Sequence, residues 1–334
     1  MLGTAVGDAL GLPMEGLSPK RARRIFGEVT GHRLLPGKGL VSDDTEHTCM
    51  VAQALVASAR EPERFQRELA RRIKHWFWML PAGVGLATLR ACLKLSIGTP
   101  PSRSGVFSAG NGPAMRSALL GLVARDYDHL VALVDASTQI THRDPRANHA
   151  AFAVALAARL SASHVQVRGE EYVALLREVL AGDSNEFIDA VARAAEATPM
   201  TTDSFAIGMG LEKGVTGYAL HTVPVCLHAW FRNPSDYRQA VGDVIACGGD
   251  SDTTGAILGA IVGAAVGVDG IPVDWVRGIA DWPRTVGWMN LLAEALASER
   301  TIPPELSPVA VLLRNAIFLA IVLTHGVRRL LPPY

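Results

Sequence analysis

Two pairs of aspartates in this sequence have the composition of a metal-ion site. Residues 42–45 (SDDT) and 250–253 (DSDT) are nearly alike, and each immediately precedes a run with helical spacing. Adjacent carboxylates repel each other, so they are stable mainly beside a cation, an arginine or capped amide groups. Carboxylate and hydroxyl oxygens suit a hard divalent ion such as Mg²⁺ or Mn²⁺. If the fold brings both motifs together, four carboxylates converge, which is very costly without a metal.

Helix capping is the alternative explanation for each pair. Asp43 followed by Glu46 fits a capping box, and Asp252 could cap the helix that follows it. Capping is sufficient for either cluster alone. Two clusters of the same composition, both at loop-to-helix junctions, favour metal binding.

Other metal and nucleotide motifs are excluded by the residues present. Residues 250–255 resemble the start of an EF-hand loop, but the twelfth position is Ile261 where a glutamate is required. The sequence contains no H-E-x-x-H, zinc-type Cys/His pattern, P-loop, G-x-S-x-G or His-Asp dipeptide. A zinc peptidase, a P-loop NTPase and a His-Asp phosphohydrolase are therefore not indicated.

A glycine-rich loop at residues 108–116 (SAGNGPAMR) precedes another predicted helix. Pro113 fits the first helical turn, which leaves backbone N–H groups of the loop free to face an anion. The alternatives are an ordinary turn or an anion-binding loop. It is not a dinucleotide fingerprint, because no strand precedes it and Met115 replaces the third glycine. His142 lies between two predicted helices, where it could cap a helix, fill the core or bond a ligand.

Helical periodicity dominates the chain and no convincing period-two alternation occurs, so the sequence predicts an all-α protein. The segments 1–18, 27–44, 96–112, 140–146 and 247–253 do not show helical periodicity, and we expect functional groups on them. The predicted helices are 45–60, 62–80, 113–124, 128–140, 146–161, 170–181, 185–197, 217–231, 235–246, 253–268, 272–280, 288–298 and 308–325.

Glycines at positions 255, 259, 263 and 267 form one stripe of a predicted helix. Each costs roughly 1 kcal/mol relative to alanine, so the stripe predicts a closely packed neighbouring helix. Residues 255–268 are apolar but too short to cross a bilayer. Residues 307–331 are longer but contain Arg314, Asn315 and His325. We predict that both segments are buried core helices, the second packing in the core or against another subunit.

Composition excludes several classes of partner. The chain has 334 residues, and its 32 Lys plus Arg equal its 32 Asp plus Glu, so a broad surface for nucleic acid or acidic lipid is not expected. The four cysteines lie far apart among apolar residues, which predicts buried free thiols in a reducing compartment. The N-terminus lacks a signal-peptide pattern. We therefore predict a cytoplasmic location and no membrane or nucleic-acid partner.

Taken together, these motifs resemble the ADP-ribosylglycohydrolase family. The resemblance begins with residues 3–11 (GTAVGDALG) and Glu15, and continues through 42–45, 110–116 and 141–142. It closes with 248–257 (GGDSDTTGAI), the most specific motif, and the motifs stand in the order of the family. The resemblance implies a compact orthogonal multi-helix bundle. We expect a single domain of this type over residues 1–334, with a motif-matched core at 3–275 and a C-terminal packing helix near 308–331.

The resemblance also implies a two-metal centre, usually magnesium with manganese as the alternative, that removes ADP-ribose from a modified side chain. It implies catalytic roles for Glu15, Asp43 and Asp252. The metal ligands it implies are Ser42, Asp43, Asp44, Asp250, Asp252 and Thr253. The residues it implies for binding the ADP-ribose are Ser108, Gly110, Asn111, Gly112, Met115 and His142, and we add Phe107 as a further candidate.

Three departures from the family pattern bear on specificity. Ser42 replaces the commoner threonine, and the hydroxyl is retained. Residues 81–85 (PAGVG) lack the aspartate that arginine-cleaving relatives carry around Gly83, which argues against an arginine linkage. Ala109 offers no aromatic ring for adenine, a role that Phe107 could take.

Three hypotheses follow from the residues and the resemblance. The first is an ADP-ribosyl hydrolase that cleaves an N- or O-glycosidic bond on a protein or a small conjugate. The second is a two-metal hydrolase of another nucleotide-ribose conjugate. The third is a non-enzymatic, crystallin-like family member. The intact set of acidic motifs argues against the third, and the oligomeric state stays open.

Overall fold

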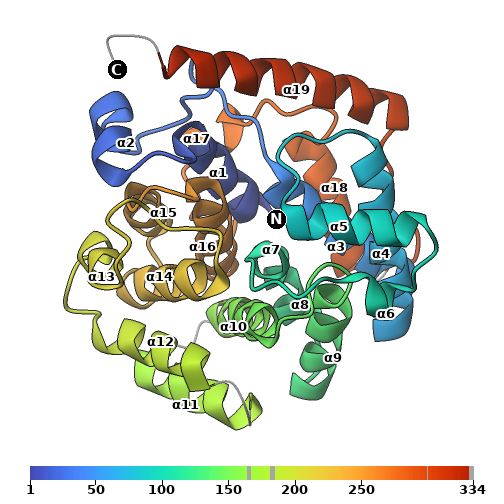
Figure 1. Cartoon of the computed structure of the whole chain (residues 1–334), viewed down its shortest axis with the longest axis horizontal. Coiled ribbons are helices and arrows are strands. Elements are labelled where there is room, and N and C mark those ends of the chain that lie inside the picture. Colours follow the sequence, from blue (N-terminus) through green and yellow to red (C-terminus); the bar gives the residue numbers. More distant parts are fainter. Residues whose placement is uncertain (164–166, 181–184, 299, 331–334) are drawn as a thin grey trace.

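A computed structural model describes residues 1–163, 167–180, 185–298 and 300–330. The described residues form α-helices, one 3₁₀ helix (η1) and isolated β-bridges, so the all-α prediction is confirmed. Figure 1 shows the helices crossing at many angles around a central pair, α1 and α16. The helix bounds are α1 Leu2–Gly11, η1 Leu12–Met14, α2 Pro19–Phe26, α3 Asp43–Ser58, α4 Pro62–Trp78, α5 Leu86–Ser96, α6 Pro101–Ser104, α7 Gly112–Met115, α8 Ala118–Val123, α9 Tyr127–Thr138, α10 Pro145–Ala162, α11 Gly169–Val179, α12 Asn185–Glu196, α13 Thr202–Gly208, α14 Ala219–Arg232, α15 Tyr237–Ala246, α16 Ser251–Val266, α17 Val273–Gly278, α18 Val286–Ala297 and α19 Pro308–Arg328.

Helices α1 and α16 pack with their backbones almost in contact. A Cβ added to Gly3 would lie 2.2 Å from the carbonyl oxygen of Gly259, and one added to Gly7 would lie 2.0 Å from that of Gly255. The pairing runs antiparallel, so the end of α1 meets the start of α16. The predicted close approach of a glycine stripe is thereby confirmed, except that Gly267 ends α16 at a positive φ of 66°.

The prediction that residues 1–18 are not helical is wrong. Residues Leu2–Gly11 form α1, and every one of them except Leu2 is buried. Its glycines suggest a loop when the segment is considered alone. Their spacing of four places them all on the face against α16, where no side chain would fit.

Two further predictions need correction. The predicted helix 113–124 is two short helices, α7 and α8, separated at Arg116. The Arg116 guanidinium is buried and donates to Ser137 and Thr141, so the chain turns there to direct this side chain inward. Helices α2, α5, α6 and α13 were not predicted.

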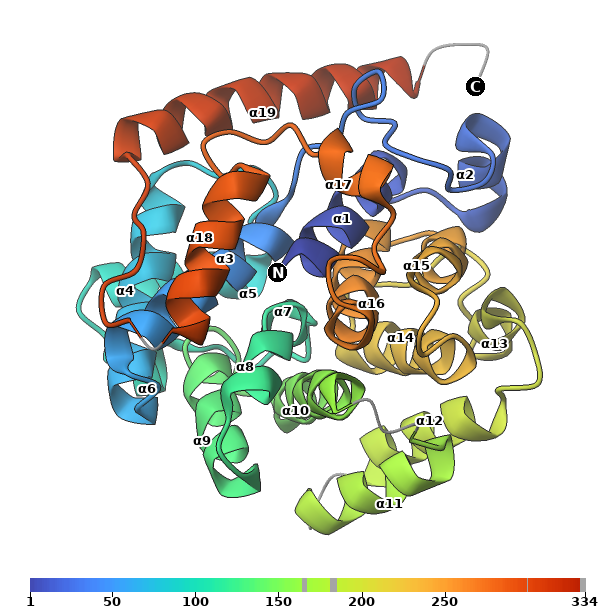
Figure 2. The ribbon, with the colours of Figure 1, turned by 180° about the vertical axis from the view of Figure 1, so that it is seen from behind.

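The long C-terminal helix α19 lies across one edge of the molecule, as Figure 2 shows from behind. Only four of its residues are buried, so the prediction of a core helix is wrong for this segment. Most of its apolar side chains face outward instead. By length and composition alone, α19 is the one helix among the described residues that could cross a membrane. By contrast, α16 is buried over most of its length, as predicted.

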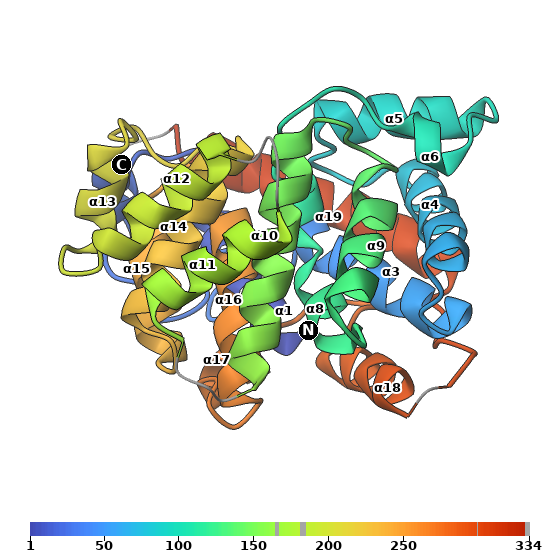
Figure 3. The same cartoon turned by 90° about the horizontal axis from the view of Figure 1, so that it is seen from below.

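The interior is otherwise filled by small and aliphatic side chains. Helix α10 lies between α14 and α16 on one side and α8 and α9 on the other, as Figure 3 shows from below, and eleven of its eighteen residues are buried. A core of such small side chains allows the helices to approach one another closely. All four cysteines are free and buried, as predicted.

Candidate functional site

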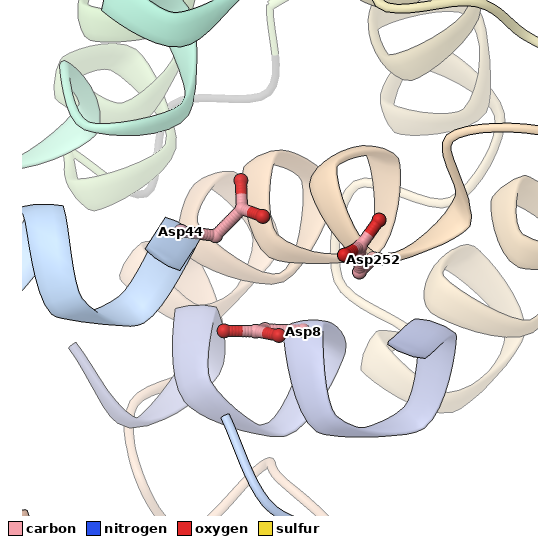
Figure 4. A group of neighbouring side chains, drawn as sticks. All are labelled: Asp8, Asp44 and Asp252. Atoms are coloured by element: carbon pink, nitrogen blue, oxygen red, sulfur yellow. The ribbon is translucent and has the colours of Figure 1, made fainter. Parts of the chain in front are cut away.

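Three buried carboxylates from three helices converge at the meeting point of α1, α3 and α16. Asp8, Asp44 and Asp252 each place one oxygen within 4.8 Å of the others, and Figure 4 shows the three side chains around one space. The fold therefore brings the two predicted acidic motifs together. Sequence reasoning missed the third member, Asp8, as a site residue.

Asp8 holds the start of α3 in place. Its carboxylate accepts hydrogen bonds from the Ser42 backbone N–H at 2.9 and 3.0 Å. It also accepts from the Thr45 N–H at 3.1 Å and the Thr45 hydroxyl at 2.5 Å. A single aspartate on an apolar helix thus fixes the backbone of the 42–45 motif. The sequence signal was present, because a charged residue in so apolar a helix is rarely buried without a specific partner.

Ser42 is the N-cap of α3, and its hydroxyl oxygen accepts from the Asp44 N–H. The capping box between Asp43 and Glu46, which was the alternative explanation for this motif, does not form. The Glu46 carboxylate is instead turned toward Arg284, Arg314 and the Trp76 indole N–H. The N-cap of α3 is thus Ser42 and not Asp43, which is half-buried.

Hydroxyl groups connect the two acidic motifs. The Ser42 hydroxyl donates to Asp44 Oδ2 at 3.0 Å, and the Thr253 hydroxyl donates to the same oxygen at 3.2 Å from α16. The other Asp44 oxygen, Oδ1, is buried without a hydrogen-bond partner. A buried, unpaired carboxylate oxygen costs free energy, and an oxygen-ligated cation would satisfy it.

Burial and mutual repulsion raise the pKa values of these carboxyl groups. Desolvation raises the pKa of Asp8 to about 7, against the opposing effect of its hydrogen bonds. Desolvation, followed by the charges of neighbouring acids, raises the pKa of Asp43, Asp44 and Asp252 well above the ordinary value. A divalent cation between these groups would reverse both effects. The donor set of carboxylates and hydroxyls fits a hard metal ion.

Asp250 links the acidic cluster to the glycine-rich loop. It is the N-cap residue of α16, but its side chain does not cap the helix. Its Oδ2 accepts instead from the Asn111 side-chain N–H at 2.6 Å, and the same amide group donates to Thr222 at 3.0 Å. The loop predicted to face an anion therefore lies directly beside the second acidic motif.

His142 packs beneath this loop. A Cβ added to Gly110 would lie 3.0 Å from its Nε2, and one added to Gly112 would lie 3.2 Å from its Cε1. Its Nδ1 pairs with the Thr141 hydroxyl at 2.9 Å. Desolvation and the nearby Arg116 lower the pKa of His142 to about 3, so the ring is neutral at pH 7. Of the three expectations, a buried core contact agrees with this geometry, and the contact with a ligand stays a prediction.

The remaining predicted binding residues differ in exposure. The Phe107 side chain is 78 % exposed, whereas Met115 is buried and its carbonyl accepts from Thr48. Ser108 is half-buried at the loop surface. The roles given to these residues therefore stay predictions.

Glu15 follows η1 at an exposed position on the rim of the acidic cluster. Enough protein surrounds its carboxyl group that desolvation, with the charge of Asp250 second, raises its pKa. The charge of Arg329 opposes this rise. An acid with a raised pKa beside a metal-type cluster is suited to proton transfer.

Gly83 lies beside Asp43. It has a positive φ of 79°, and a Cβ added there would lie 3.8 Å from Asp43 Oδ1. The position at which the sequence lacks an aspartate is therefore adjacent to the site.

A family model and several known proteins are similar to this sequence. The ADP-ribosylglycohydrolase family matches residues 1–304. The chain is 33 % identical to an uncharacterized protein of Archaeoglobus fulgidus, over 84 % of this chain and 90 % of that one. It is 28 % identical to the ADP-ribosyl-[dinitrogen reductase] glycohydrolase of Rhodospirillum rubrum, over 82 % and 87 %. It is 26 % identical to the ADP-ribosylhydrolase ARH3 of Gallus gallus, over 88 % and 91 %.

A solved structure also resembles this fold. The structure described as an ADP-ribosylglycohydrolase-related protein complex has a TM-score of 0.57 and 28 % sequence identity. The match covers 89 % of this chain and 93 % of the chain in that structure.

Proposed function

Because the chain belongs to the ADP-ribosylglycohydrolase family, whose members hydrolyse glycosyl bonds of ADP-ribose, we propose that it removes ADP-ribose from a modified side chain in a metal-dependent reaction. The observation that carries the proposal is the convergence of Asp8, Asp44 and Asp252, with one Asp44 oxygen buried and unpaired. Burying these like charges together is very unfavourable unless a cation compensates them.

The metal ligands in this proposal come from both acidic motifs. Ser42, Asp43 and Asp44 would bind from α3, and Asp250, Asp252 and Thr253 from α16. We propose two Mg²⁺ ions, with Mn²⁺ as a substitute. When bound, such ions supply Lewis acidity for the ribose hydroxyl groups and lower the pKa of a coordinated water. Asp8 would position the Ser42 backbone and add its negative charge to the site.

Substrate binding falls to the glycine-rich loop. Backbone N–H groups of Ser108, Gly110 and Gly112 would face the diphosphate, because glycine lets the backbone approach an anion closely. The Asn111 N–H donates to the Gly217 carbonyl oxygen, so Asn111 would hold the loop in its binding conformation. His142 supports the loop from below, and Met115 anchors its end. Phe107 is exposed at the start of the loop, where its ring is available to stack on adenine.

Proton transfer is assigned to acids at the rim. Cleavage at the anomeric carbon of ribose develops oxocarbenium character and requires protonation of the leaving group or activation of water. Glu15 is in position for this role because it is exposed at the edge of the cluster and its pKa is raised. Asp43 and Asp252 are the other candidates.

The leaving group is the finer part of the proposal. A guanidinium leaving group is cationic and benefits from an additional carboxylate, whereas Gly83 provides no side chain beside Asp43. We therefore propose that an O-linked side chain or a small ADP-ribose conjugate is preferred over arginine. A location in the cytoplasm, without a nucleic-acid or membrane partner, completes the proposal.

The experiment is release of free ADP-ribose from arginine-linked and serine-linked protein substrates, with Mg²⁺ or with EDTA. Asp252→Ala is the test variant, and Asp243→Ala on α15 is the matched control, because that aspartate pairs with Asn233 and Gln239 away from the cluster. Metal-dependent release that only Asp252→Ala abolishes supports the proposal.

Other outcomes select the alternatives. Release that persists in EDTA and in Asp252→Ala contradicts a metal-dependent reaction. No release from either substrate, with metal bound, favours another nucleotide-ribose conjugate. A melting temperature that saturating Mg²⁺ leaves unchanged favours the non-enzymatic, crystallin-like alternative.

A further inference from the structure

Helix α19 lies beyond the residues that the family matches, yet it reaches the back of the candidate metal site. Its exposed face is apolar, and its buried face carries Arg314 and Asn315. An ordinary surface helix buries an apolar face, whereas the buried face of α19 combines these two polar side chains with Val311 and Phe318. Buried polar contacts therefore contribute to attaching α19 to the protein.

The Arg314 guanidinium binds the residue immediately before the metal-ligand motif. Its Nη2 donates to the Val41 carbonyl oxygen at 2.5 Å. The same guanidinium pairs with Asp281, whose Oδ2 accepts from the Val41 N–H at 3.2 Å. Both backbone polar groups of Val41 are thus held by one buried ion pair. The next N–H along the chain, that of Ser42, is held by Asp8 from the other side.

Arg314 also contacts the first turn of α3. Its Nη1 donates to Glu46 Oε1 at 3.1 Å, and Arg284 pairs with the same oxygen at 2.8 Å. Two arginines and two carboxylates therefore form a buried network with balanced charge, so neither sign is left uncompensated. The network holds the chain on both sides of residues 42–44, at Val41 and at Glu46.

We propose that Arg314 is a positioning residue for the metal-ligand segment 42–44, and that α19, which carries Arg314, therefore contributes to metal binding. This inference rests on the proposed metal centre. A guanidinium offers five donors in a rigid fork, so it can hold Val41, Asp281 and Glu46 simultaneously. An ammonium group has three donors and no fork, and it cannot hold the same set of acceptors with the same geometry.

The test measures metal affinity directly, with Mn²⁺ as the probe and titration calorimetry as the readout. The full chain is compared with Arg314→Ala, Arg314→Lys and a matched control, Val311→Ala. Val311 lies one turn earlier on the buried face of α19 but forms no polar contact with the site. Far-UV circular dichroism verifies that each variant is folded. If Arg314→Ala does not fold, the Mn²⁺ affinity of Arg314→Lys tests the proposal instead, because lysine retains the charge and most of the side-chain volume.

We expect Arg314→Ala to weaken Mn²⁺ binding by about 10- to 100-fold, the usual effect of losing a group that orients metal ligands. Arg314→Lys should not restore wild-type affinity, and Val311→Ala should bind as the wild type does. In the metal-free protein, amide hydrogen exchange of the segment around residues 41–46 should be faster in Arg314→Lys than in Val311→Ala. This readout is independent of activity.

A double-mutant cycle with Ser42→Ala tests whether Arg314 affects Mn²⁺ affinity through the segment 42–44. If Arg314 acts through residues 42–44, the two substitutions together should weaken Mn²⁺ binding by less than the product of their separate effects. Equal affinity of wild type and Arg314→Lys, or an equal loss in Val311→Ala, would overturn the inference while leaving the metal centre intact. A wild-type chain with no affinity for Mn²⁺ would refute the metal centre, and with it the role of Arg314.

Discussion

The substitution Asp8→Asn tests whether the acidic cluster is destabilising when no metal is bound. The folded-state pKa of Asp8 is about 7 against an ordinary 3.8, mainly because of burial. A raised pKa means that the folded protein holds this proton while the unfolded chain has lost it. The stability associated with Asp8 is therefore fully present below pH 3.8 and is lost as the pH rises to about 7.

The size of this effect follows from the two pKa values. The rise from 3.8 to about 7, at about 1.4 kcal/mol for each pH unit, corresponds to roughly 4 kcal/mol of stability lost by the metal-free protein. Asparagine does not ionise and avoids this loss. We therefore expect the free energy of unfolding of Asp8→Asn to increase relative to that of wild type by roughly this amount between pH 4 and pH 8, so that the variant becomes relatively more stable.

Wild type must be compared with the variant because buried histidines change the stability of the folded protein with pH in the opposite direction. The pKa of His142 is lowered to about 3, so its contribution to stability is present above pH 6.5 and is lost as the pH falls toward 3. That contribution is common to wild type and Asp8→Asn and cancels in the difference.

The assay is urea unfolding in EDTA at several pH values, followed by the same series in saturating Mg²⁺. With Mg²⁺ the wild type should become the more stable form, because asparagine removes a negative charge that favours the cation. Parallel pH dependence of the two metal-free proteins would refute the reasoning, since it would mean that Asp8 ionises like an exposed carboxyl group.

Three further predictions concern protons, the rim acid and helix packing. Mg²⁺ binding near pH 6 should release protons from carboxyl groups with raised pKa values, so the calorimetric enthalpy should vary with the ionisation enthalpy of the buffer; an enthalpy independent of buffer would contradict the shifts. Arg329→Ala should raise the pKa of Glu15, because the arginine charge lowers it, and should move the corresponding limb of the pH–rate profile to higher pH; an unchanged profile would remove Glu15 from proton transfer. Gly259→Ala should destabilise the protein by at least about 2 kcal/mol, because the new methyl group would lie 2.3 Å from the Gly3 carbonyl oxygen. Its control in thermal unfolding is Gly208→Ala, where the methyl group meets nothing within 4 Å, and equal effects of the two would show that α1 and α16 can separate at low cost.

The sequence predicted the acidic motifs because adjacent aspartates are a local signal. Asp43-Asp44 and Asp250-x-Asp252 can be read without knowing the fold, and α1 and α16 then place them together. Asp8 was missed because a single aspartate has no local pattern, and because its segment was taken to be non-helical. Gly3, Gly7 and Gly11 repeat every fourth residue, as the glycines of α16 do. Matching the two stripes would have predicted both the helix and its partner.

The prediction that α19 is a core helix was wrong for a different reason. Periodicity shows that a helix is amphipathic but not which of its faces meets the protein. Arg314 and Asn315 were taken as interruptions of a core helix, whereas they form its buried attachment. Their acceptors, the carbonyl groups of Val41 and Met79, lie more than 200 residues earlier, and no local pattern specifies such a contact. For the same reason, the sequence alone did not exclude the capping box considered for Glu46, since the arginine partners of Glu46 are equally distant in the chain.

Anomalous X-ray diffraction from crystals grown with Mn²⁺ can show whether the carboxylates of the acidic motifs hold metal ions. We expect anomalous peaks in the space that Asp44 and Asp252 share, with oxygen ligands from both acidic motifs, and no peak there in crystals of Asp252→Ala. Well-diffracting wild-type crystals at saturating Mn²⁺ with no peak at that position would contradict this expectation.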